Sequence, residues 1–492
     1  MALAQMSMIP RSAPALIFLR MAWVTGSAER SLSYKLMTIL LPRAAHNRVP
    51  LDSEVEAEAG GIATRRDDGG IQGPHAPATN RVERQQRVLC SRRSIELPVE
   101  LWWKVIDFIA DGIPRWENGR IRMRELARVS RVWYTRCRFR AEERLDIIER
   151  NKKEVYWLIG RLNEYPERYD AIKKVHFEND KINTFGSFVI CMAGRLTQVE
   201  TLELSSHSSG SCDWDPGQLH TQVFLHVRIA FESVTTLGLI WVSFPSAVVF
   251  GRLLYSLPCL ASLTCNYVTF KKRGILLGTV SSPLRLATVD LVNSRDVVDF
   301  LVITRAGASL RHIAACHDQD REACSRLIRV AAFSLSSLLF SVHSGRNPNK
   351  SDDLLPDLTP AYNLRSLSIE LGPAFDSQQL AAALPRAYLP NLREMEITIL
   401  WFSDNLKFKY FDDDSYAHID RVLSGPRFPA LRKVTWHPRC RITRSKVADV
   451  TSEVSWREHL SSKLPLLHAS GRLLVSLSVD VDNEDKFSSR TF

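Results

Sequence analysis

The chain has 492 residues, of which 45% are hydrophobic and 24% are charged, as is typical of a globular protein of two to four domains. Its nine cysteines are scattered and form no CxxC pair, which argues against a disulfide framework or a zinc ribbon and favours a reducing compartment. The formal net charge is +11. Most of the basic excess precedes residue 150, so the positive charge has to be interpreted for that part of the chain alone.

Residues 1–94 are expected to form a poorly ordered N-terminal extension. Residues 8–28 have an arginine, an apolar run and small residues, as a targeting segment has, but Arg20 interrupts the run. Whether residues 1–43 are a targeting segment or a non-functional extension stays open. Five arginines between Arg81 and Arg93 end a linker without apolar periodicity. A solvated tail is favoured there over a nuclear-import or nucleic-acid patch.

Residues 95–150 are predicted to form a helical domain with an unusually apolar first helix. In the stretch ELPVELWWKVIDFIAD, at 100° per residue, Glu100, Lys104, Asp107 and Asp111 share an arc of about 60°. The apolar residues spread over roughly 220°, whereas a surface helix needs a stripe a little over about 100° wide. This predicts a helix that serves two surfaces, its own bundle and a partner.

The segment MRELARVSRVWYTRCR, which begins at Met123, is predicted to be the next helix. On a helical wheel it has an apolar seam, and the opposite face is basic, formed by Arg124, Arg128, Arg131 and Arg138. An apolar surface ringed by positive charge is typical of a binding site.

These two segments resemble an F-box, a three-helix module that docks onto the adaptor of a cullin–RING ubiquitin ligase. Leu97, Pro98, Glu100 and Leu101 match the Leu-Pro-x-Glu start of the family pattern. The run from Val129 to Trp133 matches its Val-Cys-Arg-x-Trp segment, with serine in place of cysteine. An F-box followed by irregular leucine-rich-like repeats is similar to a broad fungal family.

The resemblance implies a non-catalytic subunit whose helices insert apolar side chains into a groove of an acidic adaptor protein. The expected adaptor-binding residues are Leu97, Pro98, Leu101, Ile106, Leu126, Val129 and Trp133. The alternative for each is a place in the core of the small bundle. Core is favoured for Val105 and Ile109, and partner contact is favoured for Leu97, Pro98 and Leu101. Pro98 is expected at the first helical position, where its missing N–H costs nothing.

Residues 151–492 contain a repeat in which apolar residues follow one another at intervals of three and then two. Consecutive matches lie 24 to 43 residues apart, and the central spacings fall in the range of leucine-rich repeats. The eleven matches begin at Ile172, Val199, Val234, Leu260, Leu286, Leu310, Leu335, Leu364, Leu392, Leu431 and Leu474.

The last two apolar residues of each match alternate as in a strand that faces one core, and helical stretches separate the matches. Such units stack into one continuous core with parallel strands. The predicted fold class is therefore α/β, a small three-helix F-box followed by an irregular leucine-rich-repeat-like solenoid. An ordinary α/β domain of βα units is the alternative.

One departure from the leucine-rich pattern makes the expected solenoid irregular. The consensus places Asn or Cys three residues after the last apolar position, where it bonds the turn backbone. Here that position holds His207, Val242, Val268, Ser294, Asp318, His343, Gly372, Leu400, Arg439 and Asp482. The polar ladder is therefore expected to be missing.

The residue between the last two apolar positions of each match should point away from the core. These outward residues are His176, Glu203, Gly238, Thr264, Asp290, Ala314, Leu339, Ser368, Glu396, Thr435 and Ser478. They form neither a basic stripe nor an aromatic row, both of which a nucleic-acid groove needs. A protein target is therefore the better interpretation of this domain.

No residue set in the sequence predicts catalysis. His312, Cys316, His317 and Cys324 lie close together, but their spacing fits no common zinc finger, and no phosphate-loop or nucleophile motif occurs. We expect no catalytic residue, metal or cofactor.

The expected function is substrate recognition for an SCF-type cullin–RING ubiquitin ligase. Its partners would be the adaptor and an unknown target protein, with no nucleic acid and no membrane. The expected location is cytoplasmic, nuclear or both. The alternative is a solenoid scaffold without a ligase role, in which the helical module caps the repeat core.

Overall fold

The computed structural model describes residues 98–112, 119–178, 183–206, 212–213, 221–272, 284–317, 321–342, 356–372, 377–401, 413–443, 447 and 450–482. Within these residues the chain divides into two compact units, one ending at Ala141 and one beginning at Glu142. We call them the helical module and the repeat unit. The expectation for residues 1–94 lies outside the described residues.

The helical module has three helices, as its resemblance implies. They are α4 (Val99–Gly112), α5 (Gly119–Ala127) and α6 (Arg131–Glu142). Its core consists of eight buried residues, which are Ile106, Ile109, Met123, Leu126, Ala127, Trp133, Cys137 and Ala141. No helix in the described part of the chain combines the length and apolar character needed to cross a membrane.

The prediction of one continuous helix from Met123 onwards is wrong. A turn over residues 128–130 separates α5 from α6. The backbone N–H of Val129 donates to the Leu126 carbonyl at 3.0 Å, which closes the end of α5. The hydroxyl of Ser130 accepts from the N–H of Val132 at 3.3 Å, so this serine caps the start of α6. A helical wheel drawn across the turn is therefore not valid.

The repeat unit is built on one sheet of 13 strands in which every pair of neighbours is parallel. The strands are β1 (Arg144–Ile148), β2 (Lys174–Glu178), β3 (Thr201–Ser205), β5 (Thr236–Ile240), β7 (Ser262–Asn266), β9 (Thr288–Val292), β10 (His312–His317), β11 (Ser337–Val342), β12 (Ser366–Leu371), β13 (Glu394–Trp401), β14 (Lys433–Thr443), β15 (Leu473–Val475) and β16 (Ser478–Asp482). They follow one another in chain order, and β15 and β16 both pair with β14. A second, three-stranded sheet is formed by β4 (Cys212–Asp213), β6 (Val242–Ser246) and β8 (Thr269–Lys272).

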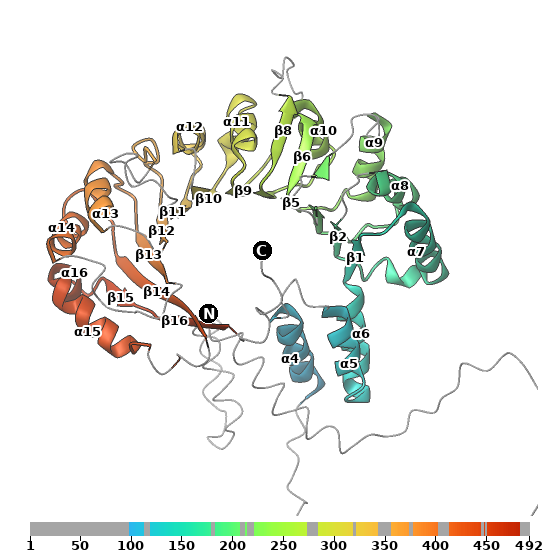
Figure 1. Ribbon diagram of the computed structural model, residues 1–492, viewed down its shortest axis with the longest axis horizontal. Helices are drawn as coiled ribbons and strands as arrows, with labels where there is room; N and C mark the ends of the chain where they lie inside the picture. The colour runs from blue at the N-terminus through green and yellow to red at the C-terminus, as the bar shows by residue number, and fades with distance from the viewer. Residues whose placement is uncertain are drawn as a thin grey trace, which may run out of the picture. The chain divides into compact units, whose positions relative to one another are not determined.

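Helices lie between most successive strands of the large sheet and cover its outer side (Figure 1). They are α7 (Lys152–Glu164), α8 (Asn183–Met192), α9 (Thr221–Ala230), α10 (Ala247–Tyr255), α11 (Arg295–Ile303), α12 (Arg321–Ala331), α13 (Ser377–Ala383), α14 (Asp413–Ser424), α15 (Glu453–Lys463) and α16 (Pro465–Ala469). Short 3-10 turns are η2 (Pro166–Arg168), η4 (Ala306–Ser309) and η5 (Leu384–Arg386). The strands line the inner side of the curved stack. The expected α/β solenoid of the leucine-rich-repeat type is therefore present.

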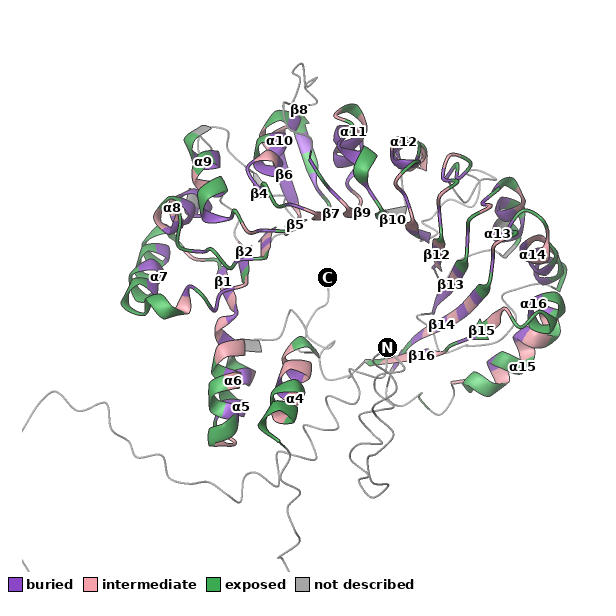
Figure 2. Ribbon diagram, turned by 180° about the vertical axis from the view of Figure 1, so that it is seen from behind, coloured by how far each residue is buried: buried purple, intermediate pink, exposed green. Residues whose placement is uncertain are grey.

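The apolar pattern explains why these segments stack. The last two apolar residues of each match face one core between the sheet and the helices, as Leu237 and Leu239 of β5 do with no exposed surface. Register pairs these positions across the sheet, for example Leu202 with Leu237 and Leu237 with Leu263. Figure 2 shows buried residues along the strands and on the helix sides turned toward them, with exposed residues outside. Ten of the eleven expected strands are confirmed in place and in register.

The eleventh match is in the right place but in the wrong register. Leu474 is 48% exposed, although the pattern makes it a buried residue. Instead, Leu473 and Val475 lie opposite Val434 and Trp436 of β14 and continue the core rows. The run LLVSLSV has apolar residues at odd and even positions, so alternation alone cannot choose the buried face.

The sheet also begins earlier than expected. Strand β1 starts at Arg144, inside the range 95–150 assigned to helices, and pairs with β2. Leu145 and Ile147 are buried in the repeat core. Glu142 occupies the first apolar position of the repeat pattern, which is why the pattern missed this strand.

The polar ladder expected to be missing is present in one unit. The Ser294 side chain is buried, and its oxygen accepts from the N–H of Val268 at 3.0 Å. Its hydroxyl is within hydrogen-bond distance of the carbonyls of Val292 and Cys265, at 2.9 and 3.2 Å. Elsewhere backbone bonds join the turns, as from Trp241 N–H to the next unit. The expectation is therefore wrong at Ser294.

Candidate functional site

Helix α4 of the helical module carries large apolar side chains on its surface. Val99, Leu101 and Trp103 are 37%, 39% and 40% exposed, and Pro98 is exposed just before them. Leu97 lies outside the described residues. The excess of apolar surface predicted for this helix is therefore present at its first turns, where the family pattern begins.

Pro98 precedes α4 rather than occupying its first position. Its carbonyl accepts from the N–H groups of Leu101 and Trp102 at 3.0 and 3.3 Å. Proline donates no backbone N–H, but its carbonyl can accept the first bonds of the helix from the flanking position. Pro98 thus fixes where the helix starts and leaves its ring on the surface.

Three of the seven expected adaptor-binding residues are buried inside the module. Ile106, Leu126 and Trp133 have 0%, 3% and 6% exposure. The Trp133 ring packs against Trp102 with ring centroids 5.2 Å apart. The three therefore lie in the core of the small bundle, which is the alternative to partner contact. The same holds for Ile109, which is buried, as favoured.

Val105 and Val129 are half-buried and pack against the module's core. Of the expected anchors that the structure describes, Pro98 and Leu101 are the exposed ones, and Val129 is intermediate. Adaptor contact by any of the seven stays a prediction.

Two acidic residues of the charged arc of α4, Asp107 and Asp111, form ion pairs with α6. The Arg136 guanidinium donates to both carboxylate oxygens of Asp107, at 2.8 and 2.6 Å. Arg140 pairs with Asp107 at 3.6 Å and also bonds Asp111. These partly exposed ion pairs fix α6 beside α4, and each contributes up to about 1 kcal/mol.

The basic residues predicted on the second segment do lie on the surface, although on two helices. Arg124, Arg128, Arg131 and Arg138 are all exposed. Exposed apolar residues accompany them, namely Ile121 (52%), Val132 (44%) and Tyr134 (50%). The module thus presents apolar side chains among positive charges, the combination that marks a protein-binding surface.

The inner face of the repeat unit carries the outward rows of the sheet. His176, Glu203, Gly238, Thr264 and Asp290 lie side by side in register on successive strands. Asp146 of β1 precedes them in the same row. Most of this row is half-buried because strands about 4.8 Å apart crowd each other on the inner side of a curved sheet.

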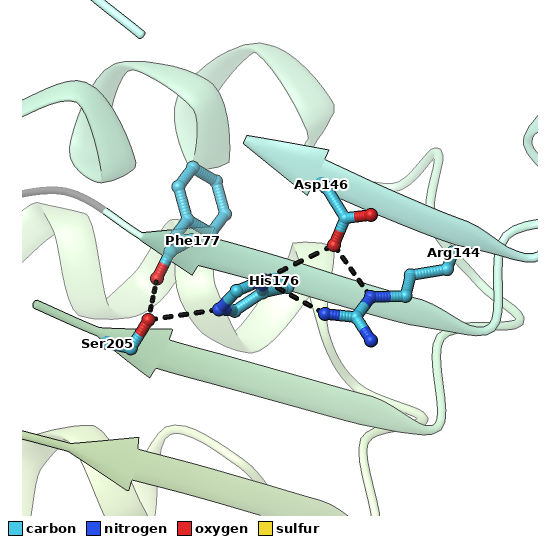
Figure 3. A network of polar contacts seen from close by, with 5 residues as sticks. All are labelled: Arg144, Asp146, His176, Phe177 and Ser205. Atoms are coloured by element: carbon cyan, nitrogen blue, oxygen red, sulfur yellow. Dashed lines mark hydrogen bonds and ion pairs between the residues drawn. The ribbon is translucent and has the colours of Figure 1, made fainter. Parts of the chain in front are cut away.

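A polar network links β1, β2 and β3 at one end of this face (Figure 3). Nδ1 of His176 lies 3.3 Å from Asp146 Oδ1 and 3.2 Å from Arg144 Nη2, and Nε2 lies 3.0 Å from Ser205 Oγ. Arg144 also bonds Asp146 at 2.6 Å, and the Ser205 hydroxyl lies 3.4 Å from the Phe177 carbonyl oxygen. The aspartate, histidine and serine follow one another on three neighbouring strands.

The contacts of this network run from strand to strand. Arg144 donates to Asp146 on β1, and Nδ1 of His176 on β2 donates to the same carboxylate. Nε2 of His176 then accepts from the Ser205 hydroxyl on β3. The network therefore ties three strands together.

Asp146 is ionised within this network. Burial alone would raise its pKa, but the contacts with His176 and Arg144 outweigh burial and hold the pKa below its ordinary value. The carboxylate and the Arg144 guanidinium thus neutralise each other on the sheet surface.

A similar network lies at the other end of the sheet. His437 is 3.2 Å from Glu396 through Nδ1 and 2.9 Å from Ser478 through Nε2. The bond with His437 is the main reason that the pKa of Glu396 lies below its ordinary value. Ser478 lies opposite Arg439 on the outward face, as predicted, but it is 2% exposed, and Leu474 instead of Ser478 lies opposite Thr435 of the common row. The register shift of the last repeat is the cause.

Comparisons with known proteins show no family for this chain. No family model matches the chain, and no curated protein matches it. Among solved structures it is similar to the leucine-rich repeat-containing protein LegL7 from Legionella pneumophila. The identity is 14% and the TM-score 0.35, over 65% of this chain and 89% of that one. The leucine-rich-repeat type of fold therefore rests on the strand pairing and apolar register described above, and no family is shown.

Proposed function

We propose that this chain is the target-receptor subunit of a cullin–RING ubiquitin ligase and has no catalytic group of its own. The observation that carries the proposal is the exposed apolar patch of α4, with Leu101 and Trp103 about two-fifths exposed on a three-helix module. The module's resemblance to an F-box gives this patch a partner, the ligase adaptor. We also propose that the helical module is an F-box, that the chain is similar to the fungal family of such proteins, and that it is located in the cytoplasm, the nucleus or both.

The charges of the module suit that partner. The resemblance implies an acidic adaptor, and Arg124, Arg128 and Arg131 are exposed on α5, the turn and α6. Opposite charges speed the encounter and orient it, and the apolar side chains then supply the contact that is buried. The groups already paired within the module, such as Asp107 with Arg136, keep the helices in place during docking.

The repeat unit would hold the target protein. Stacked repeats present extended surfaces that suit binding of another protein. Binding would raise the effective concentration of the target near the ubiquitin-charged enzyme, so the receptor accelerates transfer without doing chemistry. The networks of His176 and His437 then serve to hold the sheet, not to react.

Co-purification with a purified cullin–RING adaptor tests the proposal. We expect Pro98→Ala combined with Leu101→Asp to lower adaptor recovery at least tenfold, because both residues are exposed and the aspartate places a charge in the apolar contact. Since neither residue is in the module's core, the fold should survive, as circular dichroism will show.

The matched control is Trp157→Ala on α7, which removes a 63% exposed aromatic residue from the repeat unit. It should leave adaptor recovery unchanged. If the double variant binds the adaptor as well as the unchanged chain does, or if the unchanged chain does not bind it, the proposed function fails.

A further inference from the structure

Three arginines stand in a row where strands β12, β13 and β14 begin. Arg365, Arg393 and Arg432 each directly precede their strand and are exposed. Their backbones form a ladder, since Arg393 N–H donates to the Arg365 carbonyl and Arg432 N–H to the Arg393 carbonyl, both at 2.8 Å. Each arginine therefore occupies the same position of its repeat, and we call the three the arginine row.

The arginine row lines a groove of about 510 Å³ on the repeat unit. The residues around the groove are Phe333, Ser334, Leu335, Ser336, Asn363, Arg365, Asn391, Arg393, Ala430 and Arg432. None of these lining residues is an aspartate or a glutamate. The groove thus combines positive charge, polar groups and three apolar residues, of which Phe333 is the one aromatic.

The charge of the row is not neutralised within the described part of the chain. No ion pair to Arg365, Arg393 or Arg432 occurs among the described residues, in contrast to Arg439, which pairs with Asp480 at 2.9 Å. Glu394 follows Arg393, but its partner in register is Lys433, which offsets it. Three exposed guanidinium groups are therefore left for an external anion.

The remaining lining fits a peptide chain. The Asn363 and Asn391 side chains each donate to a backbone carbonyl at 2.9 Å, which fixes the loops before the strands. Each amide keeps its oxygen as an acceptor for a peptide N–H. At one end Phe333 is 81% exposed and packs edge-on against Tyr362, which offers an apolar contact.

We infer that the arginine row binds an acidic segment of the target protein in an extended conformation. Neighbouring strands are about 4.8 Å apart, so the three arginines span roughly 10 Å, the length of about three extended residues. Guanidinium groups pair with carboxylates in a bidentate way, which favours successive Asp or Glu side chains. This inference rests on the proposal that the repeats bind a target, not on adaptor docking.

Nucleic acid fits the groove less well. A duplex carries a charge every 1.7 Å or so, and tight electrostatic binding uses about six to ten phosphate contacts, whereas this row supplies three cations. Single strands also need aromatic platforms for successive bases. Phe333 is the single aromatic side chain among the groove's lining residues.

Fluorescence anisotropy with the full chain tests the inference. The probe is a fluorescein-labelled peptide with six glutamates between Gly-Ser flanks, and the reference is the same peptide with six glutamines. We expect binding of the glutamate peptide alone, and Arg365→Gln, Arg393→Gln and Arg432→Gln together should raise its dissociation constant about tenfold or more.

The control variant carries Arg228→Gln, Arg252→Gln and Arg421→Gln, which removes the same charge from exposed positions on α9, α10 and α14. It should bind the peptide like the unchanged chain. Equal loss in both variants, absence of binding, or a preference of the arginine row for a single-stranded oligonucleotide would overturn the inference. Adaptor co-purification is measured on the same samples. If the unchanged chain binds the adaptor but not the glutamate peptide, this inference alone is refuted. If it binds the peptide but not the adaptor, adaptor docking alone is refuted.

Discussion

The helical module and the repeat unit bury their apolar residues in different ways. The module encloses eight residues and leaves Leu101, Trp103 and Tyr134 on its surface. In the repeat unit one core runs through all of the stacked strands and helices, so each repeat completes its neighbour. A unit that cannot cover its own apolar surface is suited to docking, and a unit with a complete core can devote its exposed rows to recognition.

The largest effect on stability should come from a deletion that extends past the helical module into the first strand of the repeat unit. Deletion of residues 98–141 leaves β1 intact, and we expect the repeat unit to stay folded and soluble. Deletion of residues 98–150 also removes Leu145 and Ile147, which are buried in the repeat core. That loss should cost about 4 kcal/mol or more. Thermal unfolding of both variants is the measurement.

The shorter deletion also separates the receptor from the alternative, in which the module caps the repeat core. An insoluble product after removal of residues 98–141 alone would show that the module is a cap, and would contradict the division into two units.

Trp133→Ala should unfold the module while sparing the sheet. The indole is 6% exposed and packs on Trp102, and a truncation of this kind costs about 3 to 5 kcal/mol. Hydrogen exchange should then become fast in α4 and α6 and stay slow in β5 and β7. Trp103→Ala, in the same helix as Trp102 but 40% exposed, is the control and should change little. Fast exchange in the sheet as well would mean that the two units fold as one.

Ser294→Ala tests the side-chain link between two repeats. The substitution leaves the buried N–H of Val268 without its acceptor and should cost about 1 to 3 kcal/mol. The free energy of unfolding in urea measures it, and Ser462→Ala, at an exposed site on α15, should cost less than about 0.5 kcal/mol. Equal costs would show that backbone bonds alone hold the turns.

The smallest effect concerns pH. The folded pKa of Asp146 is below its ordinary value, so its stabilisation is full above the ordinary pKa of an aspartate and is lost as pH falls through the folded pKa. Asp146→Asn should therefore destabilise the chain by about 1 kcal/mol at neutral pH. The difference from the unchanged chain should shrink between about pH 5 and about pH 2. A difference in the free energy of unfolding that does not change with pH would contradict stabilisation by an ionised Asp146.

Local patterns predicted most of the sheet because burial on one face imposes alternation, as at Leu237 and Leu239. They failed where one residue broke the pattern. Glu142 hid β1, and the apolar run from Leu473 allowed two registers. The break between α5 and α6 has no glycine or proline, and its signal was Ser130, a good N-cap residue.

The polar networks could not be predicted, because their partners are far apart in sequence. Asp146, His176 and Ser205 are brought together only when three strands align in register. Leu-Arg pairs begin four of the matches, but only the ladder of strands shows that the arginines of three of them, Arg365, Arg393 and Arg432, are neighbours. On the module, the sequence pattern could not tell Trp133, which is buried, from Leu101, which is exposed, so the proposed docking residues divide into core and surface only in the structure.

Hydrogen exchange with each partner present tests the division of labour most directly. The purified adaptor should slow exchange in α4 and α6 and leave the sheet unchanged. The glutamate peptide should slow exchange at residues 363–366, 391–394 and 430–433 and leave the module unchanged. Protection of the repeat unit by the adaptor, of the module by the peptide, or of neither would contradict a receptor with one docking unit and one recognition unit.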